Sequence, residues 1–205
     1  YMDGEIFHQS GQDTRFICSP KLKLSLGKSG SLEGSVPSIN PKYDSLKQLS
    51  SRVTVDWDGE ELFRGRLLTL EKTFNTMKDS YFEGDLSYLV DSVQKSKKFK
   101  GKLHDHFVNV IASHNAMVEP NKQFTVGNIT VENRDIYIYG QSDAAPDPTD
   151  YQQIAINSTV DEWQNTYDYI ETTILNEVGG HLQTRNQDGI IYIDLIADND
   201  GPLST

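Results

Sequence analysis

The sequence is poor in cysteine, in long apolar runs and in positive charge. Cys18 is the one cysteine among 205 residues, which excludes an intrachain disulfide and a cysteine-based zinc site. No stretch approaches the roughly 18–20 apolar residues that span a bilayer. The start of the chain, residues 1–5, shows no basic region followed by an apolar run, so we expect no signal peptide and no membrane association.

Acidic residues outnumber basic ones by 30 to 19, which gives a net charge of −11. A surface of this sign repels a phosphate backbone at long range, so we expect no specific nucleic-acid binding. One local run of basic residues is present, Lys95–Lys102. We interpret this run as a solvated linker between two domains.

The first part of the chain shows the period-two alternation of half-buried strands. It is clearest in Lys21–Leu26 and Arg52–Trp57, and it would place Val53, Val55 and Trp57 together on the core side. The Asp58-Gly59 pair is a strong hairpin signal. Further strands are expected at 32–36, 61–68, 67–74 and 80–84, and the residues expected to close the unit on one helical face are Leu86, Leu89, Val90 and Val93.

The second part has a different pattern. A helix is predicted from the 3.6-residue spacing of Leu103, Phe107, Val110 and Ile111. A hairpin is predicted across Gly127-Asn128, because β-prone residues flank that pair.

A second helix is predicted to follow Thr159, because Thr159 and Glu162 have the spacing of a capping box. Gly179-Gly180 would end this helix, and a hairpin would then run from His181 to Leu195 across Asp188-Gly189. We expect the helix to pack on that hairpin through its apolar stripe, which consists of Trp163, Tyr167, Ile170, Ile174 and Val178.

These elements predict a β-rich α+β protein of two domains. Residues 1–95 would form an antiparallel β-barrel or sandwich, because five to seven short strands occur in fewer than ninety residues. Residues 96–205 would form a small α+β domain with two helices and two hairpins.

Residues that could form a site do not gather into a known catalytic or metal-binding pattern. His104, His106 and His114 are expected on one helix, where the first two point to opposite faces and the third lies about 15 Å from His104. The acidic stretch 194–201 lacks the spacing of a calcium loop, and the acidic loop around Asp143, Asp147 and Asp150 is interpreted as solvated. We therefore predict no catalytic, cofactor-binding or metal-binding residues, and no cofactor.

Many short segments, in order, resemble those of one family. The segments are Lys21–Leu26, Lys28–Glu33, Val36-Pro37, Asn40–Asp44, Trp57–Leu67, Phe82–Ser92, His114-Asn115, Phe124–Val131, Gly179–Leu182 and Asp188–Asp194. Together they resemble the N-terminal region of siphophage and prophage tail proteins of Gram-positive hosts, the family called tail-associated lysin, prophage endopeptidase tail or minor structural protein.

The resemblance implies a structural role at the tip or baseplate of a phage tail. The family forms a homotrimeric hub that connects the tail tube to the adsorption apparatus, and its partners are other tail proteins: the distal tail protein, the tube, the tape measure, and receptor-binding or tip proteins. Any peptidoglycan-cleaving activity sits in a C-terminal extension, so no catalytic residue carries over and we expect this chain not to be an enzyme. In such a hub, part of the acidic excess would line a passage for DNA.

Two other functions remain open from the sequence. One is a fragment of a cell-wall-degrading enzyme, a peptidoglycan hydrolase, because carboxylate pairs for glycoside hydrolysis are recognised only by their geometry in space. The other is a carbohydrate-binding module, which would present exposed aromatic residues such as Tyr137, Tyr139 and Tyr151 on one concave face.

Overall fold

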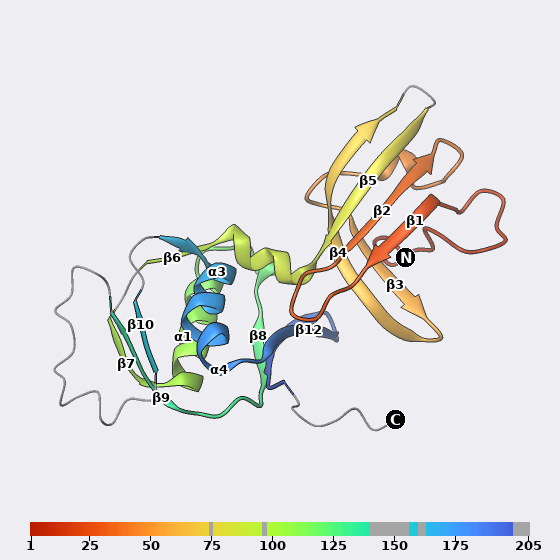
Figure 1. Ribbon diagram of the computed structural model, residues 1–205. Coiled ribbons are helices and arrows are strands. Elements are labelled where there is room, and N and C mark those ends of the chain that lie inside the picture. The colour runs from red at the N-terminus through yellow and green to blue at the C-terminus, as the bar shows by residue number, and fades with distance from the viewer. Residues whose placement is uncertain (74–75, 96–97, 140–155, 160–162, 199–205) are drawn as a thin grey trace. The chain divides into compact units, whose positions relative to one another are not determined.

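The computed structural model describes the chain except for residues 74–75, 96–97, 140–155, 160–162 and 199–205. Two units are present, Tyr1–Asp85 and Leu86–Thr205 (Figure 1), and each has its own hydrophobic core. The fold class is the predicted one, α+β and rich in strands. The sequence suggested a division near residue 95, whereas the units divide between Asp85 and Leu86.

The segment after the division explains this difference. Asp85–Asp91 forms a 3-10 helix, and Leu86 and Leu89 are buried in the core of the second unit. Val90 and Val93, which we expected on the same apolar face, are exposed. The expectation that these four residues close the first unit is therefore wrong. The 3-10 helix aligns Leu86 with Leu89 but turns Val90 away from them, and Val93 lies beyond the helix in a short strand, Val93–Gln94.

One antiparallel sheet forms the first unit and curls into a half-barrel (Figure 1). Its strand order is β1-β2-β5-β4-β3, which puts β5 at the centre and leaves β1 and β3 at the edges. The strands are β1 (Cys18–Lys23), β2 (Ser31–Pro37), β3 (Arg52–Trp57), β4 (Glu60–Lys72) and β5 (Met77–Gly84), and a short 3-10 helix, Tyr43–Ser45, lies between β2 and β3.

Apolar side chains on the inner face of this sheet form the first core. Phe82 of β5 is fully buried and meets Phe7 edge-on, with the ring centroids 6.2 Å apart. Val53 of β3 and Phe63 of β4 are also buried there. The runs that the sequence separated at 61–68 and 67–74 are one long strand, β4, which carries a register shift between Leu67 and Thr69.

The hairpin between β3 and β4 forms where the sequence predicted it. Asp58 and Gly59 both have positive φ, 52° and 82°, as a two-residue hairpin turn of type I′ requires. Trp57 pairs with Glu60 beside this turn, and 73% of its surface is exposed. The prediction of a buried Trp57 is wrong, because the alternation fixes the side of the sheet but not how far the core extends along the strand.

The connection between β1 and β2 also differs from the expectation. The alternating run Lys21–Leu26 was expected to be a strand throughout, but β1 ends at Lys23. Leu24 and Leu26 follow it in the connecting loop and are exposed. Their apolar side chains therefore contribute nothing to the core of the first unit.

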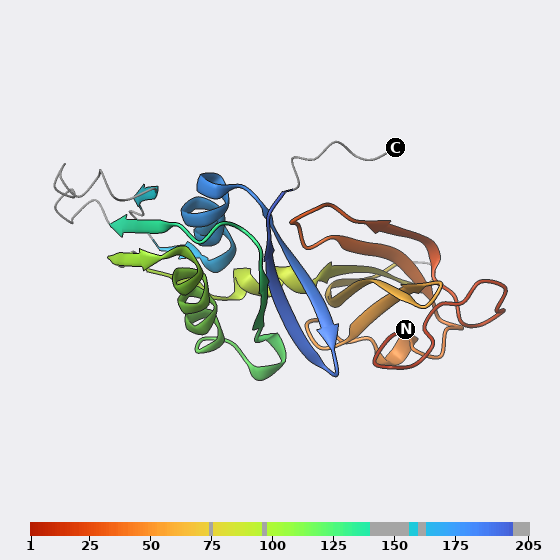
Figure 2. The same cartoon turned by 90° about the horizontal axis from the view of Figure 1, so that it is seen from below.

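In the second unit, helices lie between two small sheets (Figures 1 and 2). One sheet has the order β10-β9-β7 and the other β12-β13-β8, while β6 and β11 form a separate pair. The strands are β6 (Val93–Gln94), β7 (Phe99–Lys102), β8 (Thr125–Ile129), β9 (Asp135–Tyr139), β10 (Ile156–Thr159), β11 (Gln164–Asn165), β12 (His181–Gln187) and β13 (Ile190–Ile196). The helices are α1 (Leu103–Asn115), a 3-10 turn (Pro120–Lys122), α3 (Thr166–Ile170), a π-helical turn (Glu171–Leu175) and α4 (Asn176–Val178).

Helix α1 confirms the prediction for this region, since Leu103, Phe107, Val110 and Ile111 are all buried on one face. Strand β7 occupies part of the basic run, so Lys100 and Lys102 belong to a sheet rather than to a linker.

The second helix begins later than predicted. Its N-cap is Asn165, whose side-chain oxygen accepts a hydrogen bond from the Asp168 backbone N–H at 2.9 Å. The Asn165 amide in turn donates to the Asp168 carboxylate at 2.7 Å, so a reciprocal cap forms six positions after the predicted one. Of the predicted pair, Thr159 lies in β10 and Glu162 lies outside the described residues.

The expected apolar stripe of this helix is confirmed in part. Ile170 and Ile174 are fully buried in the second core, and Tyr167 and Val178 pack against it. Trp163 precedes the helix and is 64% exposed, so its predicted place in the stripe is wrong. Gly179-Gly180 ends the helix as expected, with positive φ at both residues.

We therefore predict that both tryptophans show the fluorescence of indole rings exposed to water. We expect Trp57 and Trp163 to emit near the wavelength of free indole and to be readily quenched by acrylamide, which is uncharged and so is not repelled by the acidic surface. Quenching of Trp57→Phe and Trp163→Phe variants would separate the two contributions. A quenching constant close to that of a buried indole in either variant would contradict the structure.

Candidate functional site

The three histidines of α1 lie in three different environments. His104 is half-buried, with its Nε2 atom 2.9 Å from the Val131 carbonyl. His106 and His114 are buried and lie eight positions apart on the helix. Among the described residues, no group of three side chains could hold a metal ion.

His114 belongs to a series of hydrogen bonds that links four segments of the second unit. Its Nε2 atom lies 3.1 Å from the Lys122 carbonyl, which can only accept, so Nε2 carries the proton. Nδ1 is then an acceptor, and the Ser92 hydroxyl donates to it at 2.6 Å. Ser92 accepts in turn from the Thr166 hydroxyl at 2.6 Å, and Thr166 accepts from the Gln94 amide at 2.8 Å.

In this hydrogen-bond network a serine donates to a histidine, which is the relation found between nucleophile and base in hydrolases. Here Ser92 and His114 are both buried, at 4% and 0% exposure, so a substrate does not reach the Ser92 oxygen in this structure. Burial lowers the pKa of His114, although the bond to the Lys122 carbonyl and the charge of Asp91 oppose that effect. A neutral His114 satisfies every bond of the network, which makes the cluster a structural tie between β6, α1 and α3.

Sequence reasoning missed this cluster because its members are far apart in the chain. Ser92 is 22 positions from His114 and 74 from Thr166. Serine, threonine and glutamine are common on surfaces, so no local pattern marks these positions as buried.

A pocket of about 540 Å³ lies beside α1. Its described lining residues are Gln94, Lys95, Phe99, His106, Asn109, Val110, Ser113 and Tyr169. The His106 ring lies 4.8 Å from the Phe99 ring and 5.8 Å from the Tyr169 ring, measured between centroids. Burial lowers the pKa of His106 to about 4 and raises that of Tyr169 to about 12, so both are neutral near pH 7.

The chemistry of this pocket is limited by what His106 can offer. The Nε2 atom of His106 is buried and has no hydrogen-bond partner among the described residues. Because that atom is shielded from solvent, a molecule in the pocket would meet the ring rather than this nitrogen. A general-base role for His106 would also need a pKa nearer to neutrality than about 4.

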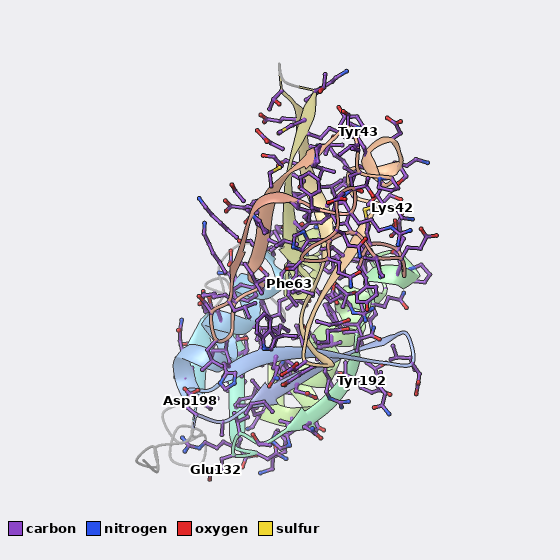
Figure 3. The ribbon with its side chains drawn as sticks, turned by 90° about the vertical axis from the view of Figure 1, so that its right-hand side faces the viewer. Lys42, Tyr43, Phe63, Glu132, Tyr192 and Asp198 are labelled. Carbon is purple, nitrogen blue, oxygen red and sulfur yellow. The ribbon has the colours of Figure 1, made fainter. Side chains whose placement is uncertain are left out.

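Asp194 of β13 contacts Gly127-Asn128, the segment where the sequence predicted a hairpin turn. Its Oδ1 atom accepts from the Asn128 backbone N–H at 2.6 Å, and its Oδ2 atom accepts from Arg185 Nε at 2.9 Å. Gly127 and Asn128 therefore do not form a turn, and the predicted hairpin there is wrong. Both residues lie within β8, which pairs with β13 in parallel and has a register shift at this point. The Arg185 guanidinium also lies 4.3 Å from the centre of the Tyr192 ring (Figure 3 labels Tyr192).

Gly127 is expected to tolerate no side chain. A β-carbon added there would lie 2.0 Å from Asp194 Oδ1, so Gly127→Ala forces the carboxylate away from the Asn128 N–H. We expect a loss of about 1–3 kcal/mol in the free energy of unfolding, measured in urea. Asn128→Ala is the matched control, because it keeps the backbone donor, and equal stability of the two variants would count against this contact.

Asp198 forms a second acidic contact, next to the end of β13. It accepts from the Gly180 backbone N–H at 3.0 Å and pairs with His181 Nδ1 at 2.9 Å. The His181 bond, followed by the Gly180 bond, lowers the pKa of Asp198. Asp198 and Glu132 line one small pocket (Figure 3).

The remaining sequence candidates are only partly described. Asp143, Asp147 and Asp150 lie outside the described residues, as do residues 199–201 of the acidic stretch. Of the aromatic residues expected for a carbohydrate-binding face, Tyr137 is buried and stacks on Tyr139 with centroids 5.6 Å apart, and Tyr151 is not described. A face that presents Tyr137 to a sugar is therefore not formed.

An aromatic residue that is exposed, unlike Tyr137, lies at the tip of the β3–β4 hairpin. Trp57 stands there with Leu62, also exposed, and with Asp56, Asp58 and Glu60. Within the described residues, no helix is long and apolar enough to cross a membrane.

No family model and no curated protein matches the chain. Solved structures that it resembles include the prophage tail protein gp18 from Listeria monocytogenes EGD-e, with a TM-score of 0.47 and 14% identical residues. That alignment covers 86% of this chain and 44% of the Listeria chain. The present chain thus spans less than half the length of that protein.

Proposed function

We propose that this chain is a structural component of a phage tail, located at the tail tip or baseplate. The observation that carries the proposal is the ordered set of segments, from Lys21–Leu26 to Asp188–Asp194, that resembles the N-terminal region of tail hub proteins. The β-rich α+β architecture agrees with the fold that this resemblance implies. In this role the chain would contact other tail proteins and, within the whole protein, would form a homotrimer.

Within the described residues, the polar side chains that most resemble a catalytic pair act as structural contacts. The serine and histidine that come closest to a catalytic pair, Ser92 and His114, are sealed inside the second unit and satisfy each other. His106 is neutral over the physiological range. The bonds of Ser92 and His114 hold elements of the second unit together.

Mass spectrometry of purified virions tests the proposal. Peptides of this chain should be present, at a fixed ratio to the tail-tube protein across particles purified by two independent methods. Their absence from virions that contain the other tail proteins would refute the proposal.

A peptidoglycan hydrolase is the second candidate, and a zymogram separates it from the first. The purified chain should leave no clearing in a gel cast with bacterial cell walls, while lysozyme in the next lane clears it. A cleared band that persists in Ser92→Ala and His114→Gln variants would place a catalytic site elsewhere and would refute the assembly role as the whole function.

A further inference from the structure

The tip of the β3–β4 hairpin presents a tryptophan to solvent on a fixed support. Trp57 forms the last strand pair with Glu60, and the turn between them holds both of its residues at positive φ. Such a turn matches the twist of the two strands and restrains the tip. A large ring held in water at 73% exposure forgoes the free energy that its burial would release.

Negative charge surrounds this ring. Asp56, Asp58 and Glu60 are exposed at the tip. Glu61 is bound by Arg64 of the same hairpin, with Arg64 Nε 3.0 Å from Glu61 Oε1 and Arg64 Nη2 2.5 Å from Glu61 Oε2. Four carboxylates and one guanidinium therefore lie within residues 56–64, and the field around Trp57 attracts cations.

The free edge of β3 is partly used by the chain itself. The Thr54 N–H donates to the Tyr1 carbonyl at 3.0 Å, and the Asp3 N–H donates to the Arg52 carbonyl at 3.0 Å. Because Tyr1–Asp3 covers the edge along Arg52–Thr54, a partner does not extend the sheet there by adding a strand. Binding at this end would instead use the side chains of the hairpin tip.

We propose that Trp57 inserts into an apolar socket rimmed by Lys and Arg on a different, basic protein of the same assembly. Tryptophan is among the residues most enriched at the energetic centres of interfaces, and cations favour the face of its ring. The acidic rim would steer such a partner and align it. Leu62, at the register shift between β3 and β4, adds exposed apolar surface to the same hairpin.

Charge argues against a second copy of this chain as the occupant. Each copy carries a net charge of −11, so the acidic tip meets a surface of the same overall sign on a second copy, whereas the homotrimer of the whole protein would use other contacts. A basic partner removes that repulsion and complements the three exposed carboxylates. The inference rests on the proposed function, because it takes the partner from the tail.

Hydroxyl-radical footprinting tests whether Trp57 is covered. Free full-length chain and intact tails would be oxidised under the same dose, and oxidation of Trp57 and of Trp163 would be measured by mass spectrometry. We expect Trp57 to react readily in the free chain and at least about ten-fold more slowly in tails. Equal oxidation of Trp57 in both samples overturns the inference alone, whereas absence of the chain's peptides from tails overturns the proposed function as well.

Zero-length cross-linking with a carbodiimide identifies the occupant. The reagent joins a carboxylate directly to a nearby lysine, so Asp56, Asp58 or Glu60 should be linked in intact tails to a lysine of another tail protein. Links made solely to lysines of this chain would overturn the inference in favour of a second copy or of the chain's own second unit. The free chain at the same concentration is the control for links within one molecule.

Substitution of Trp57 tests whether its ring is needed for incorporation of the chain into tails. Trp57→Ser should lower incorporation of the chain into tails at least about ten-fold, while Trp57→Phe should retain part of it. Trp163→Ser, which removes the other exposed tryptophan, is the matched control and should incorporate normally. Equal incorporation of Trp57→Ser and Trp163→Ser would overturn the inference.

Discussion

Phe82→Ala is expected to lower the free energy of unfolding of the first unit by about 3–5 kcal/mol. Phe82 lies on the central strand β5, is fully buried and contacts Phe7, so its removal leaves a cavity that the paired strands on both sides cannot fill. The loss should appear as a lower midpoint in a urea melt followed by circular dichroism, with the slope unchanged.

Trp57→Ala is the matched control for this cavity. It deletes a still larger ring from the same sheet, but from a position in water, so we expect a change below about 1 kcal/mol. A loss for Trp57→Ala as large as that for Phe82→Ala would mean that Trp57 packs into a core, and would contradict the placement of the hairpin tip.

Acidification is expected to destabilise the second unit through His106. The unfolded state takes up a proton near pH 6.5, whereas the folded state resists until pH is about 4, because burial lowers the pKa of His106. The unfolded state therefore binds more protons between these values, and stability that is complete above pH 6.5 is lost as pH falls toward 4. The difference of about 2.5 units corresponds to a loss of about 3 kcal/mol.

Urea melts between pH 7.5 and 4 would measure this loss. Ellipticity at 222 nm reports mainly on α1 and α3, which belong to the second unit. His106→Phe should remove most of the pH dependence, since a phenyl ring takes up no proton in either state, and the remainder should include His114, whose pKa is lowered as well. His8→Gln, an exposed position in the first unit, is the control, and a His106→Phe variant with the full pH dependence would contradict the assignment.

The sequence predicted those elements whose signals are local. Asp58-Gly59 and Asp188-Gly189 form the predicted hairpins because two adjacent residues with positive φ define the turn by themselves. Helix α1 was predicted because its stripe is regular from Leu103 to Ile111. In each case the information lies within a few residues of the feature.

Features that depend on distant residues were not predictable in the same way. Gly127-Asn128 has the composition of a turn, yet it lies within a strand because Asp194, more than sixty positions later, accepts the Asn128 N–H. The second helix begins at the Asn165–Asp168 cap, whose spacing is as visible in the sequence as that of Thr159 and Glu162. Local spacing alone could not decide between the two.

The exposed tryptophans show the same limit. Alternation correctly placed Val53 on the core side, but it could not show that the hairpin extends beyond the core before Trp57. The cluster of Ser92, His114 and Thr166 shows the reverse case, in which polar residues are buried. It could not be predicted, because these residues are far apart in the chain and are brought together by the packing of α1 and α3.

Immunogold labelling of intact virions tests the central claim most directly. Antibodies raised against the purified chain, viewed by negative-stain electron microscopy, should place gold at the end of the tail that is distal to the capsid. Particles whose gold lies on the capsid or along the tail shaft, or particles left unlabelled by an antibody that recognises the chain in disrupted virions from the same preparation, would contradict a role at the tail tip.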